Sequence, residues 1–186
     1  MKDVDLVTIN SDQAQFHLEE LIETYLDVHS SDADEFFSEE RYRRQLESHL
    51  KAPGWAAVCA YQEGKLIGYV YGFRLSEGTA WWDGLVDEAP ADFVHETGTK
   101  TFAISELLVR KKYQRQGVAT LLHNELVENR TEERATLLVR PENSAAQTAY
   151  QSWGWQKVNR LHPDWGSITA PTYDVMIRQL SGSNRT

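Results

Sequence analysis

The chain has 186 residues, of which 41% are hydrophobic and 11% aromatic, and a formal net charge of −9. This composition predicts one globular domain with a proper core and argues against disorder. The acidic balance disfavours nucleic acid as a partner. We find no signal sequence and no long apolar run, so we predict a cytoplasmic protein that does not interact with a membrane. Cys59 is the single cysteine, which excludes a disulfide framework and a CxxC metal site, and we expect no bound metal.

The first 50 residues predict a strand and two helices. Val4–Ile9 has the pattern of a short strand, and Ser11 or Asp12 can cap the helix that follows it. Apolar residues at helical spacing continue that helix to Val28. The same spacing predicts a second helix over Phe36–Leu50.

A β-hairpin is predicted next. Its strands are the apolar runs Trp55–Tyr61 and Leu66–Leu75, which are joined by a short turn that contains glycine. Gly68 and Gly72 are unusual inside a strand, so they indicate a close approach of the backbone to another segment.

Ser76–Lys100 is the least regular segment of the chain. Long connections in compact domains are usually functional or mobile. Paired tryptophans beside carboxylates suit a cationic, partly apolar ligand, whereas a solvated loop with one packed tryptophan is the alternative. The acidic residues are Glu77, Asp83, Asp87, Glu88, Asp92 and Glu96, and the tryptophans are Trp81 and Trp82.

The second half of the chain alternates strands and helices. Thr101–Val109 predicts a central strand, a helix begins at Gly117, and Asn143 can cap a later helix that ends at Gly154. The remaining predictions are strands over Ala135–Val139, Trp155–Leu161 and Tyr173–Leu180, a loop over His162–Pro171 and a frayed tail over Ser181–Thr186.

Ile104–Thr120 combines a strand, a basic turn and a helix start, which together predict an anion site. The first N–H groups of a helix have no internal partner, and the helix dipole favours negative charge there. Gly117 and Ala119 let a phosphate come close to the backbone. A strand–helix turn with a solvated basic loop is the alternative; the basic residues are Lys111, Lys112 and Arg115.

Two motifs in this half resemble one known family. Gln114–Ala119 matches Q/R-x-x-G-x-G/A after a strand, and Asn143–Trp155 matches N-x-x-A-x-x-x-Y-x-x-x-G-F/W. In this order, separated by a helix and a strand, they resemble the GCN5-related N-acetyltransferases (GNAT superfamily). The resemblance is close over residues 101–157. The P-loop pattern GxxxxGK[ST] and the dinucleotide pattern GxGxxG are absent.

The resemblance implies a mixed α/β fold in one acetyltransferase domain over residues 1–180, with residues 181–186 as a flexible tail. The family fold has a mostly antiparallel central sheet of about six or seven strands, a splayed central strand pair and about four flanking helices. It also implies acetyl-CoA as the cofactor and a small-molecule amine as the partner. Family members are often dimers, so a homodimer is a further option.

In the family, helix N–H groups hold the pyrophosphate of the cofactor, and the free edge of the central strand binds its pantetheine arm. A backbone N–H at Leu108 would polarise the thioester carbonyl as an oxyanion donor. By this resemblance the cofactor-binding positions are Leu107, Leu108, Val109, Gln114, Arg115, Gln116, Gly117, Val118, Ala119, Thr120, Asn143 and Tyr150.

Two residues are candidates for proton transfer. Tyr150 holds the family position of the acid that protonates the departing thiolate, and core packing is its alternative role. Glu106 is the only titratable side chain of the central strand and could accept the proton of the amine, directly or through water. Strand alternation places Ser105 and Glu106 on opposite faces unless a bulge intervenes. In several relatives the base matches Ser105 or Ala103, so a structural role for Glu106 stays open.

In the family, two helices before the hairpin form one wall of the acceptor pocket. Tyr25 and His29 are therefore candidate substrate contacts, with core and surface roles as alternatives. The other candidates are Trp81, Trp82, Asp83 and Ser105.

The predicted activity is transfer of acetyl to a small cationic amine through a ternary complex. The acceptor would be an aminoglycoside-like antibiotic, a polyamine or an amino-acid derivative. A peptide or protein N-acetyltransferase and a non-catalytic acyl-CoA sensor are the alternatives.

Overall fold

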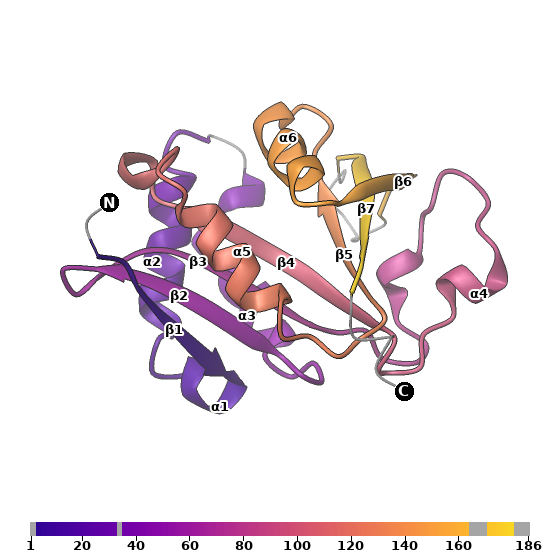
Figure 1. Cartoon of the computed structure of the whole chain (residues 1–186), viewed down its shortest axis with the longest axis horizontal. Helices are drawn as coiled ribbons and strands as arrows, with labels where there is room; N and C mark the ends of the chain where they lie inside the picture. Colours follow the sequence, from indigo (N-terminus) through magenta and orange to yellow (C-terminus); the bar gives the residue numbers. More distant parts are fainter. Residues whose placement is uncertain (1–2, 33–34, 164–170, 181–186) are drawn as a thin grey trace. The chain divides into compact units, whose positions relative to one another are not determined.

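The computed structural model describes residues 3–32, 35–163 and 171–180, and seven strands lie within them. They are β1 (Asp5–Asn10), β2 (Ala56–Gln62), β3 (Lys65–Arg74), β4 (Thr101–Val109), β5 (Arg134–Val139), β6 (Gln156–Leu161) and β7 (Tyr173–Gln179). The sheet order is β1-β2-β3-β4-β5-β7-β6 (Figure 1). β4 pairs with β5 in parallel, while β1–β2, β2–β3, β5–β7 and β6–β7 are antiparallel. The expected mixed, mostly antiparallel fold is confirmed.

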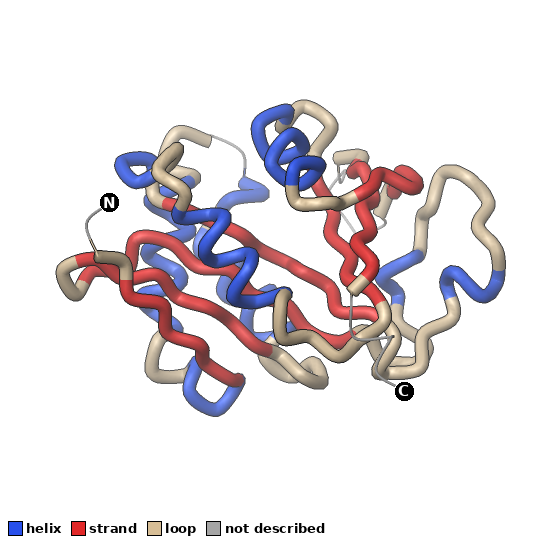
Figure 2. Tube along the Cα trace, in the orientation of Figure 1, coloured by secondary structure: helices blue, strands red, loops and turns tan. Residues whose placement is uncertain are grey.

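Four helices of nine to eleven residues and two single-turn helices lie in the described ranges (Figure 2). The longer ones are α2 (Leu18–Val28), α3 (Glu39–His49), α5 (Val118–Val127) and α6 (Ser144–Ser152). The single turns are α1 (Ser11–Ala14) and α4 (Ala91–Val94), and three 3₁₀ turns cover Glu35–Phe37 (η1), Ala80–Trp82 (η2) and Lys111–Tyr113 (η3).

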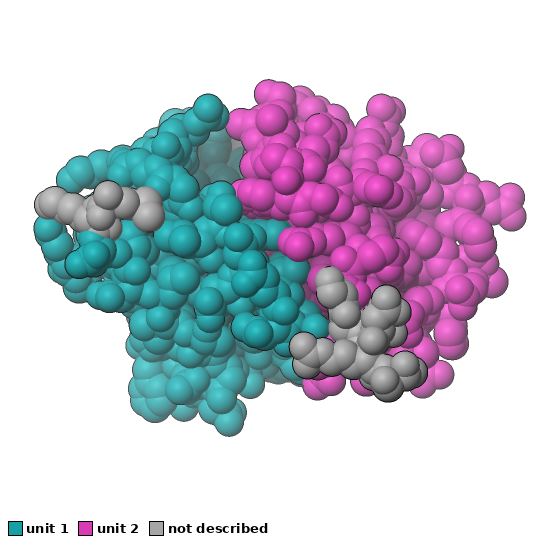
Figure 3. Space-filling model, viewed as in Figure 1, with its two compact units in different colours: residues 1–73, 105–130 teal, residues 74–104, 131–186 magenta. Residues whose placement is uncertain are grey.

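The chain forms two compact units (Figure 3). Unit 1 consists of Met1–Phe73 and Ser105–Arg130, and unit 2 consists of Arg74–Ile104 and Thr131–Thr186. β4 contributes its first four residues to unit 2 and its last five to unit 1. A single domain over residues 1–180 stays a prediction. The predicted tail and residues 164–170 of the predicted loop lie outside the described residues.

In unit 1, α5 crosses in front of the strands, and α2 and α3 lie behind them (Figure 1). The two rear helices each carry apolar residues at helical spacing. Leu21 and Ile22 of α2 and Leu46 of α3 are buried. The single thiol, Cys59, lies in β2 and is fully buried as a structural side chain.

Two helix boundaries near the N-terminus differ from the sequence predictions. Asn10, not Ser11 or Asp12, caps α1: its Oδ1 accepts from the Gln13 N–H at 3.0 Å, and the Gln13 side chain accepts from the Asn10 N–H at 3.0 Å. This capping box starts a single turn, and the long helix α2 begins only at Leu18. The second predicted helix also starts late, because η1 (Glu35–Phe37) forms a separate turn before α3.

The close approach predicted at Gly68 is confirmed. A Cβ atom at this position would lie 2.6 Å from the carbonyl oxygen of Leu108 and 3.1 Å from the Cα of Val109. The Arg110 N–H also donates to the Ile67 carbonyl at 2.9 Å. Glycine therefore lets the backbone of β3 lie directly against the end of β4.

In unit 2, the connection between β3 and β4 is attached to the edge strand β6. Leu85 forms a bridge with Leu161, and the Val86 N–H donates to the Arg160 carbonyl at 2.9 Å. The side chain of Asn159 donates to the carbonyl of residue 87 at 2.9 Å. This part of the connection thus lies on β6 in the manner of a short additional strand.

Candidate active site

The first half of β4 pairs with β5 within unit 2. Thr101–Ile104 lie in parallel register with Arg134–Leu137. The last five residues of β4 belong to unit 1, and they include Leu107, Leu108 and Val109, the predicted positions for an extended arm. The splayed strand pair stays a prediction.

The helix start that follows fits an anion. Gly117 is the N-cap of α5 with φ 83°, and no side chain caps the helix there. The first turn, which holds Val118, Ala119 and Thr120, contains no acidic residue. A Cβ atom at Gly117 would meet nothing within 4 Å, so the space beside this residue is open. The first turn can therefore cradle a pyrophosphate.

Two glutamines shape the loop before α5. Gln114 donates from Nε2 to the Val109 carbonyl at 2.9 Å, and Gln116 donates to the Lys112 carbonyl at 2.9 Å. Both side chains thus hold loop backbone. Arg115 has φ 61°, a left-handed conformation. It is exposed two residues before the helix start, where its guanidinium can contact an anion.

Arg110 fixes this loop to α2, and the sequence analysis missed it. Its guanidinium donates to the Leu66 carbonyl at 2.9 Å, to Thr24 Oγ1 at 3.0 Å and to Glu23 Oε1 at 3.1 Å. It also lies 3.2 Å from Asp27 Oδ2. All these partners lie 44 or more residues away in the sequence, so no local pattern indicates the contact.

We expect Gly117→Glu to weaken acetyl-CoA binding at least tenfold, about 1.4 kcal/mol, because it places bulk and negative charge where the pyrophosphate would lie. Calorimetric titration of the folded variant measures the change. Gly98→Glu is the matched control, since Gly98 has φ 82° and equally open surroundings. Equal affinity in the two variants would remove this loop from the cofactor site.

Ser105 and Glu106 both contact the same face of α3. Gln45 Nε2 donates to Glu106 Oε1 at 3.3 Å. One helical turn later, His49 Nδ1 lies 3.3 Å from Ser105 Oγ and 3.0 Å from the hydroxyl of Tyr71, and Ser105 Oγ donates to that hydroxyl at 3.2 Å. Strand alternation predicted that Ser105 and Glu106 face opposite sides. This prediction is wrong in one respect, because both side chains contact residues of the same helix, α3. The sequence analysis missed Gln45, His49 and Tyr71.

Burial sets the charge state of this cluster. It raises the pKa of Glu106 to about 7, against the lowering effects of the Arg41 charge and the Gln45 hydrogen bond. It lowers the pKa of His49 to about 4, and the charge of Arg41 lowers it further. At neutral pH His49 is uncharged, while Glu106 titrates near neutrality. A carboxyl group with such a pKa is matched to proton transfer at physiological pH.

Tyr25 belongs to the core. Its ring stacks on Tyr42 with 3.6 Å between centroids, and only 2% of its surface is exposed. The Tyr42 hydroxyl in turn lies 2.6 Å from that of Tyr69. His29 stacks on Phe37 at 4.3 Å between centroids, at the partly exposed end of the same group of rings. Tyr25 therefore has the alternative role, that of a core aromatic, and not that of a substrate contact.

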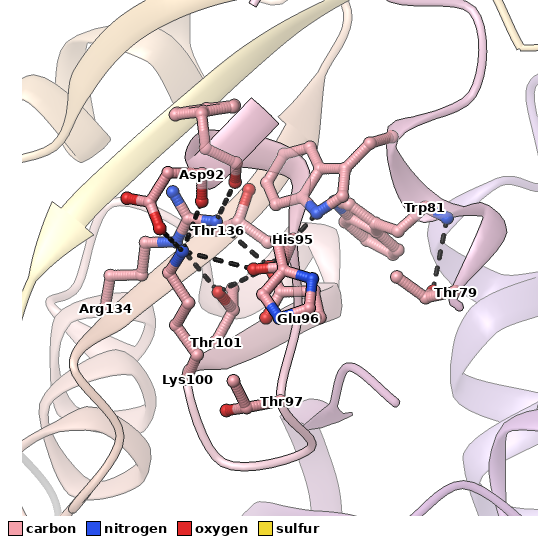
Figure 4. A network of polar contacts seen from close by, with 12 residues as sticks. Thr79, Trp81, Asp92, His95, Glu96, Thr97, Lys100, Thr101, Arg134 and Thr136 are labelled. Atoms are coloured by element: carbon pink, nitrogen blue, oxygen red, sulfur yellow. Dashed lines mark hydrogen bonds and ion pairs between the residues drawn. The ribbon is translucent and has the colours of Figure 1, made fainter. Parts of the chain in front are cut away.

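The acidic connection in unit 2 contains a buried charge network (Figure 4). Glu96, which is 1% exposed, accepts at Oε1 from Trp82 Nε1 at 3.0 Å, from Thr101 Oγ1 at 2.8 Å and from Arg134 Nη2 at 2.9 Å. The Arg134 guanidinium also lies 5.1 Å from the centroid of Trp82 and 4.6 Å from that of Phe93. The structure therefore corrects the prediction that Trp82 faces a cationic ligand, because the cation is the protein's own arginine.

The acidic residues of this connection other than Glu96 are exposed. Asp83 is exposed and Trp81 is half-buried. The other exposed acidic residues are Glu77, Asp87, Glu88 and Asp92. These residues stay candidates for contact with the acceptor.

Two predicted residues lie on α6 in unit 2. Asn143 caps the helix as expected, since its Oδ1 accepts from the Ala146 N–H at 3.1 Å. Tyr150 is half-buried, and its ring meets Trp153 and Trp155 edge-on, with centroids 5.7 and 5.9 Å apart. Its role as the acid stays a prediction.

Comparisons with known proteins identify the family. The model of the Acetyltransferase (GNAT) family matches residues 18–155. Among solved structures, the ribosomal-protein-S18-alanine N-acetyltransferase from Escherichia coli aligns with TM-score 0.63 and 15% identity, covering 99% of each chain. NAA60 from Arabidopsis thaliana, in complex with a bisubstrate analogue, aligns with TM-score 0.63 and 19% identity, covering 97% of this chain and 99% of its own. The PaiA N-acetyltransferase from Thermoplasma acidophilum, in complex with coenzyme A, aligns with TM-score 0.54 and 11% identity, covering 95% and 99%.

No curated protein sequence is significantly similar to the chain. None of the helices in the described ranges has the length and apolar character needed to cross a bilayer.

Proposed function

Because the chain belongs to the GNAT family of acetyltransferases, which use acetyl-CoA, we propose that it is a cytoplasmic enzyme that acetylates a primary amine of a small cationic acceptor. The acceptor is an aminoglycoside-like antibiotic, a polyamine or an amino-acid derivative. The observation that carries the proposal is the Glu106 carboxyl group. It has a pKa of about 7, lies in the second half of β4 and accepts a hydrogen bond from Gln45 Nε2 at 3.3 Å.

Cofactor binding, oxyanion stabilisation and the two proton transfers are each assigned to a residue or segment of the chain. When bound, acetyl-CoA supplies the acetyl group as an activated thioester. The backbone N–H groups at the start of α5 hold the pyrophosphate, with Arg115 nearby. The Leu108 N–H stabilises the developing oxyanion. Glu106 takes the proton of the amine so that the amine can attack directly in a ternary complex, and Tyr150 protonates the departing thiolate.

Tyr150→Phe removes the phenolic proton and keeps the ring and its packing. We expect kcat to fall by roughly 10²-fold, the usual scale for general acid catalysis, with little change in acetyl-CoA affinity. Single-turnover kinetics separates this loss from any effect on product release. A variant with the wild-type rate of chemistry would make Tyr150 a packing residue.

The proposal is tested by incubating the purified protein with acetyl-CoA and a panel of amines while the released thiol is measured. We expect turnover with at least one small cationic amine and less with neutral amines of the same size. Peptides with free N-termini are included to test the peptide alternative. Two of the aligned structures motivate this choice, the ribosomal-protein-S18-alanine N-acetyltransferase and NAA60. Tight binding of acetyl-CoA without turnover of any amine or peptide would support a sensor instead.

A further inference from the structure

One face of α3 contacts Ser105 and Glu106 of β4. Gln45 and His49, one turn apart, contact Glu106 and Ser105 respectively. Arg41 precedes Gln45 by four residues and therefore lies on the same helix face. This face thus presents a cation, an amide and a neutral imidazole in sequence along the helix.

Arg41 is held in place by contacts with Phe36. Its Nη1 donates to the Phe36 carbonyl at 2.9 Å, and its guanidinium lies 3.5 Å from the centroid of the Phe36 ring. By contrast, Arg43 and Arg44 of the same helix both form ion pairs with carboxylates. Among the residues that the structure describes, no carboxylate forms an ion pair with the half-buried Arg41. A guanidinium has five donors in a fixed fork, so most of its capacity for a planar anion remains unused.

We propose that the acceptor carries a carboxylate beside its reacting amine, so that Arg41 binds the carboxylate while Glu106 receives the proton of the amine. The acceptor is then an α-amino acid or a close derivative, one of the three classes considered above, and the inference rests on the proposed acetyltransferase activity. Charge complementarity supports this choice. A guanidinium binds a carboxylate through two parallel hydrogen bonds, whereas a polyamine would bring further positive charge toward Arg41.

Electrostatics agrees with this geometry. The charge of Arg41 acts on both Glu106 and His49 and lowers the pKa of each. Since burial keeps His49 uncharged at neutral pH, Arg41 is the cation of this helix face. A zwitterion meets opposite charges there, with its ammonium toward Glu106 and its carboxylate toward Arg41.

The proposed step is balanced. The amine loses one proton to Glu106, the new N–C bond forms at the acetyl carbon as the C–S bond breaks, and the thiolate receives one proton. The products are an N-acetylamino acid with its carboxylate intact and free CoA. No oxidant or other reactant is needed.

The test compares the twenty protein amino acids with their C-terminal amides as acceptors, using acetyl-CoA and detection of the released thiol. We expect at least one free amino acid to have a kcat/KM at least tenfold higher than its own amide. Amides that match or exceed every free acid, or turnover of simple amines alone, would overturn the inference and leave the acetyltransferase activity standing.

Variants of α3 assign the preference to one side chain. Arg41→Gln should reduce the acid-to-amide ratio of kcat/KM at least tenfold, and Arg41→Lys should restore part of it. Arg44→Gln, an exposed position on the same helix, is the matched control and should leave the ratio unchanged. An unchanged ratio in folded Arg41→Gln contradicts the proposal.

Failure of the proposed function gives a different result. If no amine is acetylated, calorimetric titration of the CoA-bound protein with the same acids and amides still reports on Arg41. Tighter binding of an acid than of its amide, lost in Arg41→Gln, supports the carboxylate site. Equal affinities overturn it.

Discussion

Replacing Arg134 by methionine is expected to lower the free energy of unfolding by about 3–5 kcal/mol, the usual cost of removing one partner from a buried ion pair. The variant leaves the Glu96 carboxylate buried without its cation. Glu96 Oε2 already makes no hydrogen bond to the described residues, so only the donors of Trp82 and Thr101 would remain, both on Oε1. The loss is measured by urea unfolding at neutral pH, followed by circular dichroism.

Two variants separate the cost of an unpaired charge from other effects. The double variant Arg134→Met, Glu96→Leu should recover much of the stability, because apolar residues of similar volume can replace a buried pair. Arg44→Met removes an arginine whose side chain is 72% exposed and should change stability by less than about 0.5 kcal/mol. If Arg134→Met were as mild as Arg44→Met, the network would not stabilise the protein.

Glu106→Gln is expected to lower kcat/KM at pH 8 by about 10²–10⁴-fold, the range for loss of a general base. Only the ionised carboxylate can accept a proton, and with a pKa of about 7 it is ionised above neutrality. The wild-type profile should therefore rise through pH 7, and the variant should lose this limb. The exposed Glu47→Gln on α3 serves as the control. A variant that keeps both rate and limb would falsify the assignment of Glu106 as the base.

The same substitution has a consequence for stability. Burial raises the pKa of folded Glu106 from the ordinary 4.5 to about 7, so the folded state retains a proton that the unfolded state releases. Wild-type stability should thus decline as pH rises through this interval, and then level off. Glu106→Gln should be more stable than the wild type above pH 7, with a difference that disappears toward pH 4. Chemical unfolding at several pH values measures this trend, which turnover does not influence.

Local patterns in the sequence predicted much of the fold. Helix α2 ends at Val28, and Asn143 caps α6, both as expected from spacing and capping chemistry. Gly68 was predicted to mark a close backbone contact, and only its partner near Leu108 was unknown. These features depend on residues a few positions apart, or on the one property of glycine that no other residue shares.

The site depends on partners that are distant in the sequence. In the sequence, Glu96 resembles the other acidic residues of its loop, because its cation Arg134 follows 38 residues later, at the start of β5. His49 and Arg41 carried no motif, and their importance comes from packing of α3 against a strand more than 50 residues away, where His49 meets Ser105. Charge states such as that of Glu106 follow from burial, which a sequence pattern alone does not give.

Within unit 2, the connection between β3 and β4 is held at two places, on β6 through Leu85–Asp87 and on Arg134 through Glu96. Between these attachments, Glu88–Asp92 is mostly exposed. Substitutions there alter the charge and shape of the surface at little cost in folding free energy. The charge and shape of this short stretch can therefore be varied separately from the two attachments that hold the connection in place.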